Sequence, residues 1–105
     1  MTWVALFLAA GFEIVWALAL KRSDGFSHLG PSIVFLIAAP LSVLLLALAL
    51  RELPVGTAYA IWTGTGAVGT AILGIVLLAE PASASRLLPI GLIAVGIAWL
   101  ALGTK

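Results

Sequence analysis

The chain has 105 residues, of which 64% are hydrophobic and only 9% are charged, and its formal net charge is +1. A water-soluble domain of this size does not need so much apolar surface, so the composition indicates an integral membrane protein. The few charges form no basic patch for nucleic acid, and the absence of cysteine excludes disulfides, thiolate catalysis and cysteine metal sites. We expect no nucleic-acid partner, no metal and no cofactor.

Four apolar runs follow one another along the chain, separated by short charged or turn-rich breaks. The predicted helices cover about residues 3–20, 30–50, 55–79 and 87–102. Each is long enough to cross a hydrocarbon core about 30 Å thick. The sequence therefore predicts an all-α membrane protein with four transmembrane helices in a single domain, residues 1–105.

Glu13 is the only charged residue inside the first run. At about 1.5 Å of rise per residue it lies roughly 15 Å deep, close to the bilayer midplane. A charge at that depth costs on the order of 3 kcal/mol on insertion scales. Its side chain is too short to reach the headgroups, and the five lysines and arginines all stand at the ends of apolar runs. We therefore interpret Glu13 as part of an ion or substrate pathway.

Two polar or aromatic residues are candidates for contact with this carboxylate. Trp16 follows Glu13 at i+3, so we expect the two to share a face of the helix, where a carboxylate beside a π-surface suits an organic cation or a proton. Ser42 is the one polar side chain in the body of the second run. Its hydroxyl either bonds back to its own helix or donates to Glu13, and spacing alone leaves both interpretations open.

The third run places Tyr59 and Trp62 at i, i+3 on one face, which Thr63 and Gly66 continue. Tyr59 fits an aromatic belt at the membrane surface, whereas Trp62 is about two turns further in, so we expect it to face the bundle. This run also contains glycines that allow either close approach of another helix or bending. They are Gly64, Gly66, Gly69 and Gly74.

The fourth run has no charge and presents a surface of small residues. Gly91 and Gly96, with Ala94 and Ala98, leave room for a second helix and offer no polar chemistry. Small residues are enriched where membrane helices pack closely. We therefore expect Gly91 and Gly96 to mediate dimerisation.

The cations give only a weak orientation signal. If the first and third breaks share a side, that side carries Lys21, Arg22 and Arg86, against Arg51 and Lys105 on the other. With so little asymmetry, copies can insert in both orientations and pair with each other. Transport by rocking requires a site between two units related by an axis in the membrane plane, which an antiparallel homodimer can supply.

Several segments closely resemble the small multidrug resistance transporters, and the resemblance covers the whole chain. They are FEIVWALALK at 12–21, SDGF at 23–26, Pro31-Ser32 and, most specifically, LPVGTAYAIWTG at 53–64. Trp16 after Glu13, and Trp62 followed by Thr63, resemble the guanidinium-exporter branch, because the promiscuous drug exporters typically carry a small residue at the position of Trp16. The chain departs from the pattern of that branch at Ala10 and Thr65.

This resemblance implies an antiparallel, dual-topology homodimer among the lipids of the bacterial inner membrane, which exchanges protons for guanidinium. It further implies that Glu13 is the shared site for the proton and the substrate. The residues around that site would be Trp16, Ser42, Tyr59, Trp62 and Thr63.

The chemistry of a buried carboxylate agrees with this expectation. Removal from water favours the protonated form, while a bound cation favours the charged form, so proton and cation compete for one site. Guanidinium is planar and weakly hydrated, binds carboxylates through two hydrogen bonds and stacks on aromatic rings. We therefore expect a transporter and not an enzyme.

Three alternatives remain at this stage. A multidrug exporter would use the same carboxylate for quaternary ammonium cations, and a channel would share the lining residues without coupling two fluxes. A non-transporting membrane assembly subunit would have no use for a carboxylate at the midplane, so removing Glu13 should stabilise it.

Overall fold

The computed structural model describes residues 1–103 and consists of four helices. They are α1 (Thr2–Arg22), α2 (Leu29–Ala49), α3 (Val55–Leu78) and α4 (Ala84–Gly103). All four are long and apolar enough to cross a membrane, by length and composition. The prediction of an all-helical fold with four membrane-spanning helices is therefore confirmed. Lys105, one of the two cations expected on the second side, lies outside the described residues.

The helix ends follow from local backbone and charge effects. α1 continues through Lys21 and Arg22, where two cations interact favourably with the negative end of the helix dipole. α4 begins at Ala84, ahead of the predicted start at residue 87, because the Ser83 carbonyl accepts hydrogen bonds from the backbone N–H groups of Arg86 and Leu87. The first turn of α4 therefore brings Arg86 into the helix.

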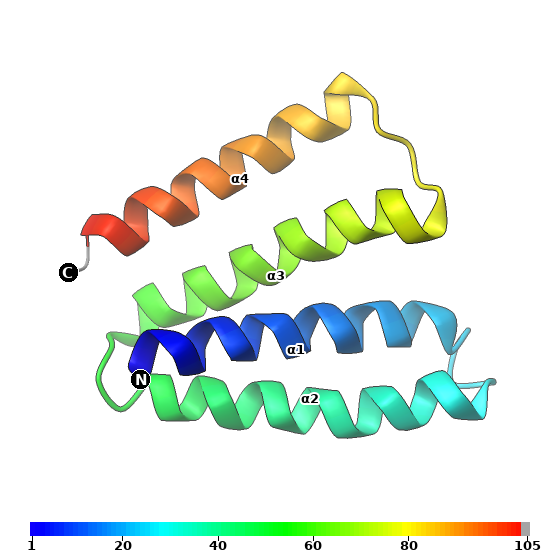
Figure 1. Ribbon diagram of the computed structural model, residues 1–105, viewed down its shortest axis with the longest axis horizontal. Coiled ribbons are helices and arrows are strands. Elements are labelled where there is room, and N and C mark those ends of the chain that lie inside the picture. Colours follow the sequence, from blue (N-terminus) through cyan, green and yellow to red (C-terminus); the bar gives the residue numbers. More distant parts are fainter. Residues whose placement is uncertain (104–105) are drawn as a thin grey trace.

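Each helix runs antiparallel to the one before it, so the loops alternate between the two ends of the molecule (Figure 1). The α1–α2 and α3–α4 loops lie at one end, and the α2–α3 turn lies at the other. α1 packs between α2 and α3, while α4 packs along α3 and diverges from the other two helices. The end that carries the α1–α2 and α3–α4 loops is called the loop end, and it contains Lys21, Arg22 and Arg86.

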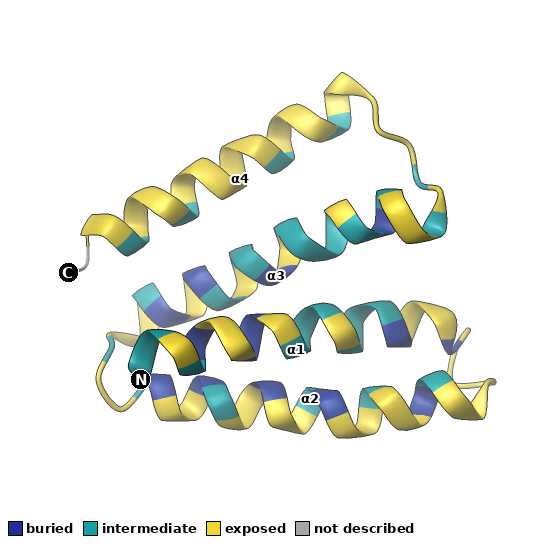
Figure 2. Ribbon diagram, in the orientation of Figure 1, coloured by how far each residue is buried: buried dark blue, intermediate teal, exposed yellow. Residues whose placement is uncertain are grey.

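A small core forms where α1, α2 and α3 meet, and the partly buried Ile97 and Ala101 of α4 pack against it. Its members are Leu6, Ala9, Leu46, Ala49, Ala58 and Ile61. Figure 2 shows the contrast: buried residues mark the facing sides of α1, α2 and α3, whereas the described residues of α4 include none. Leu92 and Trp99 on α4 are 73% and 78% exposed. Apolar surface of this extent must face lipid or another protein chain.

Candidate substrate site

The carboxylate of Glu13 points from α1 toward α3, where it lies against Gly66. An added Cβ at Gly66 would overlap the Glu13 carboxylate, so the missing side chain is what makes room for it. Glu13 Oε1 is buried and has no hydrogen-bond partner within residues 1–103. A buried polar atom without a partner is costly, and a carboxylate oxygen accepts either a proton or a cationic ligand.

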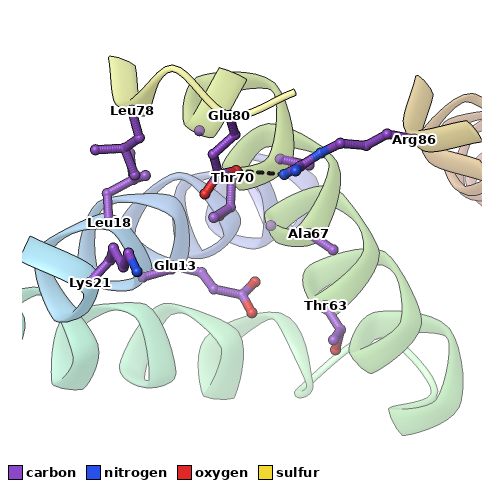
Figure 3. A pocket seen from close by; sticks show the side chains of 13 residues that line it. Glu13, Leu18, Lys21, Thr63, Ala67, Thr70, Leu78, Glu80 and Arg86 are labelled. Carbon is purple, nitrogen blue, oxygen red and sulfur yellow. Dashed lines mark hydrogen bonds and ion pairs between the residues drawn. The ribbon is translucent and has the colours of Figure 1, made fainter. Parts of the chain in front are cut away.

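Glu13 lines a cavity of about 420 Å³ between α1, α3 and the start of α4. The cavity extends from Glu13 to the loop end of the molecule (Figure 3). Thr63 and Thr70 of α3 are the hydroxyl-bearing residues that line it. Its remaining charged residues are Lys21, Glu80 and Arg86.

Thr63 presents its hydroxyl oxygen as an acceptor. Its Oγ1 donates to the carbonyl oxygen of Tyr59 at 2.6 Å, so the single hydroxyl hydrogen is already engaged. The lone pairs of the same oxygen can then accept a hydrogen bond from a cation that carries N–H groups. Thr63 thus lines the same cavity as Glu13, and its assignment to a substrate site stays a prediction.

Ser42 and Trp62 form a hydrogen-bond chain that joins three helices. The buried Ser42 Oγ donates to the Ala9 carbonyl oxygen of α1 at 2.6 Å and accepts from Trp62 Nε1 of α3 at 3.0 Å. Both interpretations of the Ser42 hydroxyl, a bond within its own helix and a bond to Glu13, are therefore wrong. The reason is that Ala9 lets α2 approach α1 closely enough for Ser42 to reach the α1 backbone. The Tyr59 ring packs on Trp62, with 5.6 Å between ring centroids.

Trp16 does not share the face of Glu13. Its ring packs edge-on against Phe35 of α2, with centroids 5.7 Å apart, and it is not among the residues that line the Glu13 cavity. At 3.6 residues per turn, positions i and i+3 differ by about 60° around the helix axis. That difference suffices to direct Glu13 toward α3 and Trp16 toward α2. Trp16 Nε1 is a second buried polar atom without a partner in the described part of the chain.

The cavity thus brings together Glu13 and Thr63, while Ser42, Tyr59 and Trp62 form a separate group against α1 and α2. The assignment of these residues and of Trp16 to a substrate site stays a prediction.

Four of the five glycines of α3 are used for close approach. Each faces a side chain that an added Cβ would overlap or crowd. The partners of Gly64, Gly66, Gly69 and Gly74 are Ile97, Glu13, Ile14 and Glu80, respectively. Of the two uses that the sequence left open, the contacts support close packing.

Gly91 and Gly96 of α4 face open space in the single chain. An added Cβ at either position would meet nothing within 4 Å. Gly96 also lines a hollow on the outside of α4 together with Trp99, Leu100 and Gly103. A role of these glycines in dimerisation stays a prediction.

Sequence reasoning named Thr63 but missed Thr70, Glu80 and Arg86, which line the same cavity. Thr63, Gly66, Thr70 and Gly74 follow one another at i, i+3, i+7 and i+11, a stripe of small and polar residues on α3 that could have identified this wall. By contrast, Glu80 and Arg86 meet only because the linker folds back at Ala79, which has a left-handed backbone conformation. No sequence pattern indicates that contact.

Comparison with known proteins adds independent information to this geometry. The family model described as Small Multidrug Resistance protein matches residues 1–93. The chain belongs to the small multidrug resistance family. The family resemblance predicted from the sequence is therefore confirmed.

Relatives of this small multidrug resistance protein match over nearly their whole lengths. A "Guanidinium exporter" of Yersinia pseudotuberculosis is 58% identical over 104 residues, which cover 99% of this chain and 100% of the relative. One of Citrobacter freundii is 54% identical, with 99% of both chains covered. One of Salmonella typhimurium strain LT2 is 56% identical over 102 residues, or 97% of both chains.

Family membership and the four apolar helices identify the protein as a multi-pass protein of the bacterial inner membrane. The names of the relatives are those of transporters. That this chain is not an enzyme stays a prediction.

Proposed function

We propose that this small multidrug resistance protein exports guanidinium-type cations in exchange for protons, and that the two compete for Glu13. One observation carries the proposal: a carboxylate near the middle of an apolar helix has a buried oxygen with no partner among residues 1–103, and it opens onto a cavity. The names of the relatives support the choice of cation.

The lining of the cavity suits a cation with many N–H donors. Guanidinium can place two parallel hydrogen bonds on the Glu13 carboxylate, and its remaining N–H groups require acceptors. The Thr63 oxygen can accept because its hydrogen is bonded to the Tyr59 carbonyl. Thr70 lines the same cavity about two helical turns closer to Glu80 and offers a second hydroxyl. A quaternary ammonium cation has no N–H group and would leave these acceptors unused.

Competition at one carboxylate accounts for exchange in opposite directions. A proton on Glu13 removes the charge that binds the cation, and a bound cation stabilises the charged form. The two ligands then occupy the site alternately, because each excludes the other. Coupling follows from this exclusion and needs no separate proton site.

We further propose that the working unit is an antiparallel homodimer with dual topology. The exposed apolar surface of α4 and the open positions of Gly91 and Gly96 support a second copy at this helix. The weak charge asymmetry between the two ends supports insertion in both orientations. In such a dimer the aromatic residues of both copies would complete the walls around the two Glu13 carboxylates. The proposed aromatic and serine lining residues are Trp16, Ser42, Tyr59 and Trp62.

One observation favours the alternative of a more apolar cation. A second cavity, of about 400 Å³, lies between α1, α3 and α4 and is lined by apolar side chains such as Phe7, Ile14 and Val68. Glu13 does not line it. An aromatic or alkylated cation could place its apolar part there, so substrate range separates the two candidates.

Reconstituted protein tests the proposal. Liposomes with an acidic interior should take up guanidinium against its gradient, because outward proton flow drives inward cation flow. Glu13→Gln keeps the shape of the side chain, removes the titrating group and should abolish this uptake. If the Gln variant accumulated guanidinium as the unchanged protein does, the proposal would be wrong. Preference for a quaternary ammonium cation over guanidinium would favour the alternative.

A further inference from the structure

A second carboxylate lines the same cavity as Glu13. Glu80 follows α3, and its carboxylate lies over Gly74, where an added Cβ would overlap it. The Glu80 backbone N–H also donates to the Gly74 carbonyl oxygen at 3.3 Å. These two contacts with Gly74 hold Glu80 at the loop end of the cavity, on the side of Thr70 away from Thr63 (Figure 3).

The group that this carboxylate binds is itself a guanidinium. Arg86 reaches from the first turn of α4 and donates from Nη2 to Glu80 Oε1. Figure 3 shows the two side chains meeting above the cavity that contains Glu13. Both side chains are 34% exposed, so the pair is accessible to water and to solutes. The protein therefore carries, beside its central carboxylate, an internal example of the contact that a guanidinium substrate would make.

We propose that Glu80 is an outer binding site for guanidinium-type cations, at which the substrate exchanges with the Arg86 side chain before it reaches Glu13. This inference rests on the proposed function of Glu13. Exchange is feasible because partly exposed ion pairs are weak. It also preserves the charge on Glu80, since one guanidinium replaces another. Lys21 lines the same end of the cavity. Because it is itself a cation, it cannot pair with a released Arg86.

A purely structural role for the pair makes a different prediction. If the ion pair only fastened α4 to the end of α3, the loss of either partner would break the same contact. Glu80→Gln and Arg86→Gln would then impair transport in the same direction. As an outer binding site, Glu80 competes for Arg86 and for substrate, so the two substitutions should act in opposite directions.

The experiment measures KM for guanidinium uptake into liposomes for both single variants and their combination. Glu80→Gln should raise KM about threefold, and Arg86→Gln should lower it about threefold, the size expected of a partly exposed ion pair. In the Glu80→Gln background, Arg86→Gln should have no further effect, because the carboxylate that it would uncover is gone. Glu80→Asp should restore part of the loss. Chromatography of each variant shows whether its oligomeric state is intact.

Lys21→Gln is the matched control, because it removes a cation from the same cavity and leaves the pair intact. Lys21→Gln should change KM by the same factor in the otherwise unchanged protein and in the Glu80→Gln variant. An outer site would be refuted by KM shifts of the same sign in both single variants, or by an Arg86→Gln effect that persists in the double variant. Those outcomes would leave guanidinium exchange by the unchanged protein intact. Failure of the unchanged protein to exchange guanidinium would overturn this inference and the proposed function together.

Discussion

At the scale of single residues, the chemistry depends on the fact that the Glu13 carboxylate has no ion-pair partner in the described structure. This carboxylate projects from an apolar helix against Gly66, and one of its oxygens is buried without a partner in the part of the chain that the structure describes. A carboxylate in this state is stabilised by whichever positive ligand arrives, proton or cation. Its position against Gly66 and its missing partner are therefore the basis of the proposed exchange.

Gly66→Ala should weaken guanidinium binding without unfolding the helix. The added methyl group would overlap the Glu13 carboxylate and displace it from its present position. Overpacking of this kind costs about 1–3 kcal/mol, or roughly 5- to 150-fold in affinity if it falls on the bound state. Titration of the purified variant with guanidinium measures the loss. Gly56→Ala is the control, since an added Cβ in the first turn of the same helix meets nothing within 4 Å. Equal affinities in the two variants would refute the space-making role of Gly66.

Ser42→Ala should lower thermal stability. It removes the donor to the Ala9 carbonyl and the acceptor for Trp62 Nε1, in a buried position between three helices. A buried polar group left without a partner costs about 1–3 kcal/mol. The midpoint of thermal unfolding in detergent should therefore fall relative to Ser85→Ala, which alters an exposed serine. Identical midpoints would show that this hydrogen-bond chain does not hold the helices together.

At the scale of helices, α4 differs from the other three. α1, α2 and α3 share a core, whereas α4 packs along α3 and leaves most of its large apolar side chains exposed. Hydrophobicity alone does not drive helices together in lipid, so close packing of small residues must supply the contact. Gly91 and Gly96 leave such a surface on α4.

Gly96→Leu should reduce the dimer content. A bulky side chain at an open position of α4 would prevent a second helix from approaching closely. Transport should fall in proportion to dimer content, and cation binding per remaining dimer should persist. Cross-linking in lipid measures the dimer fraction, with Gly30→Leu in α2 as the control at another open glycine. A Gly96→Leu variant that stayed fully dimeric and active would show that this surface of α4 does not form the dimer interface.

The helices could be predicted from the sequence because long apolar runs with charged ends leave few alternatives in a membrane. The central carboxylate was also predictable, since Glu13 interrupts such a run. The directions in which side chains point around the helix axes could not be predicted from the sequence. Trp16 faces α2 and Ser42 bonds the α1 backbone, and both depend on how helices rotate when they pack.

At the scale of the whole molecule, the single chain contains a cavity with a carboxylate near mid-helix and a carboxylate–guanidinium pair at the loop end. Alternating access requires two related units around such a site. Four helices with one exposed helix surface provide one of these units, and an antiparallel copy would provide the other. Whether proton and cation share one carboxylate can be tested without assuming any transport geometry.

The most direct test is proton release on cation binding. Guanidinium is added to purified protein in weakly buffered detergent solution, across the pH range in which the central carboxylate titrates. Binding should release protons, and the release should diminish at higher pH because Glu13 is already charged. Glu13→Gln should release none. Guanidinium binding with no proton release at any pH, or undiminished release from the Gln variant, would contradict a shared site at Glu13.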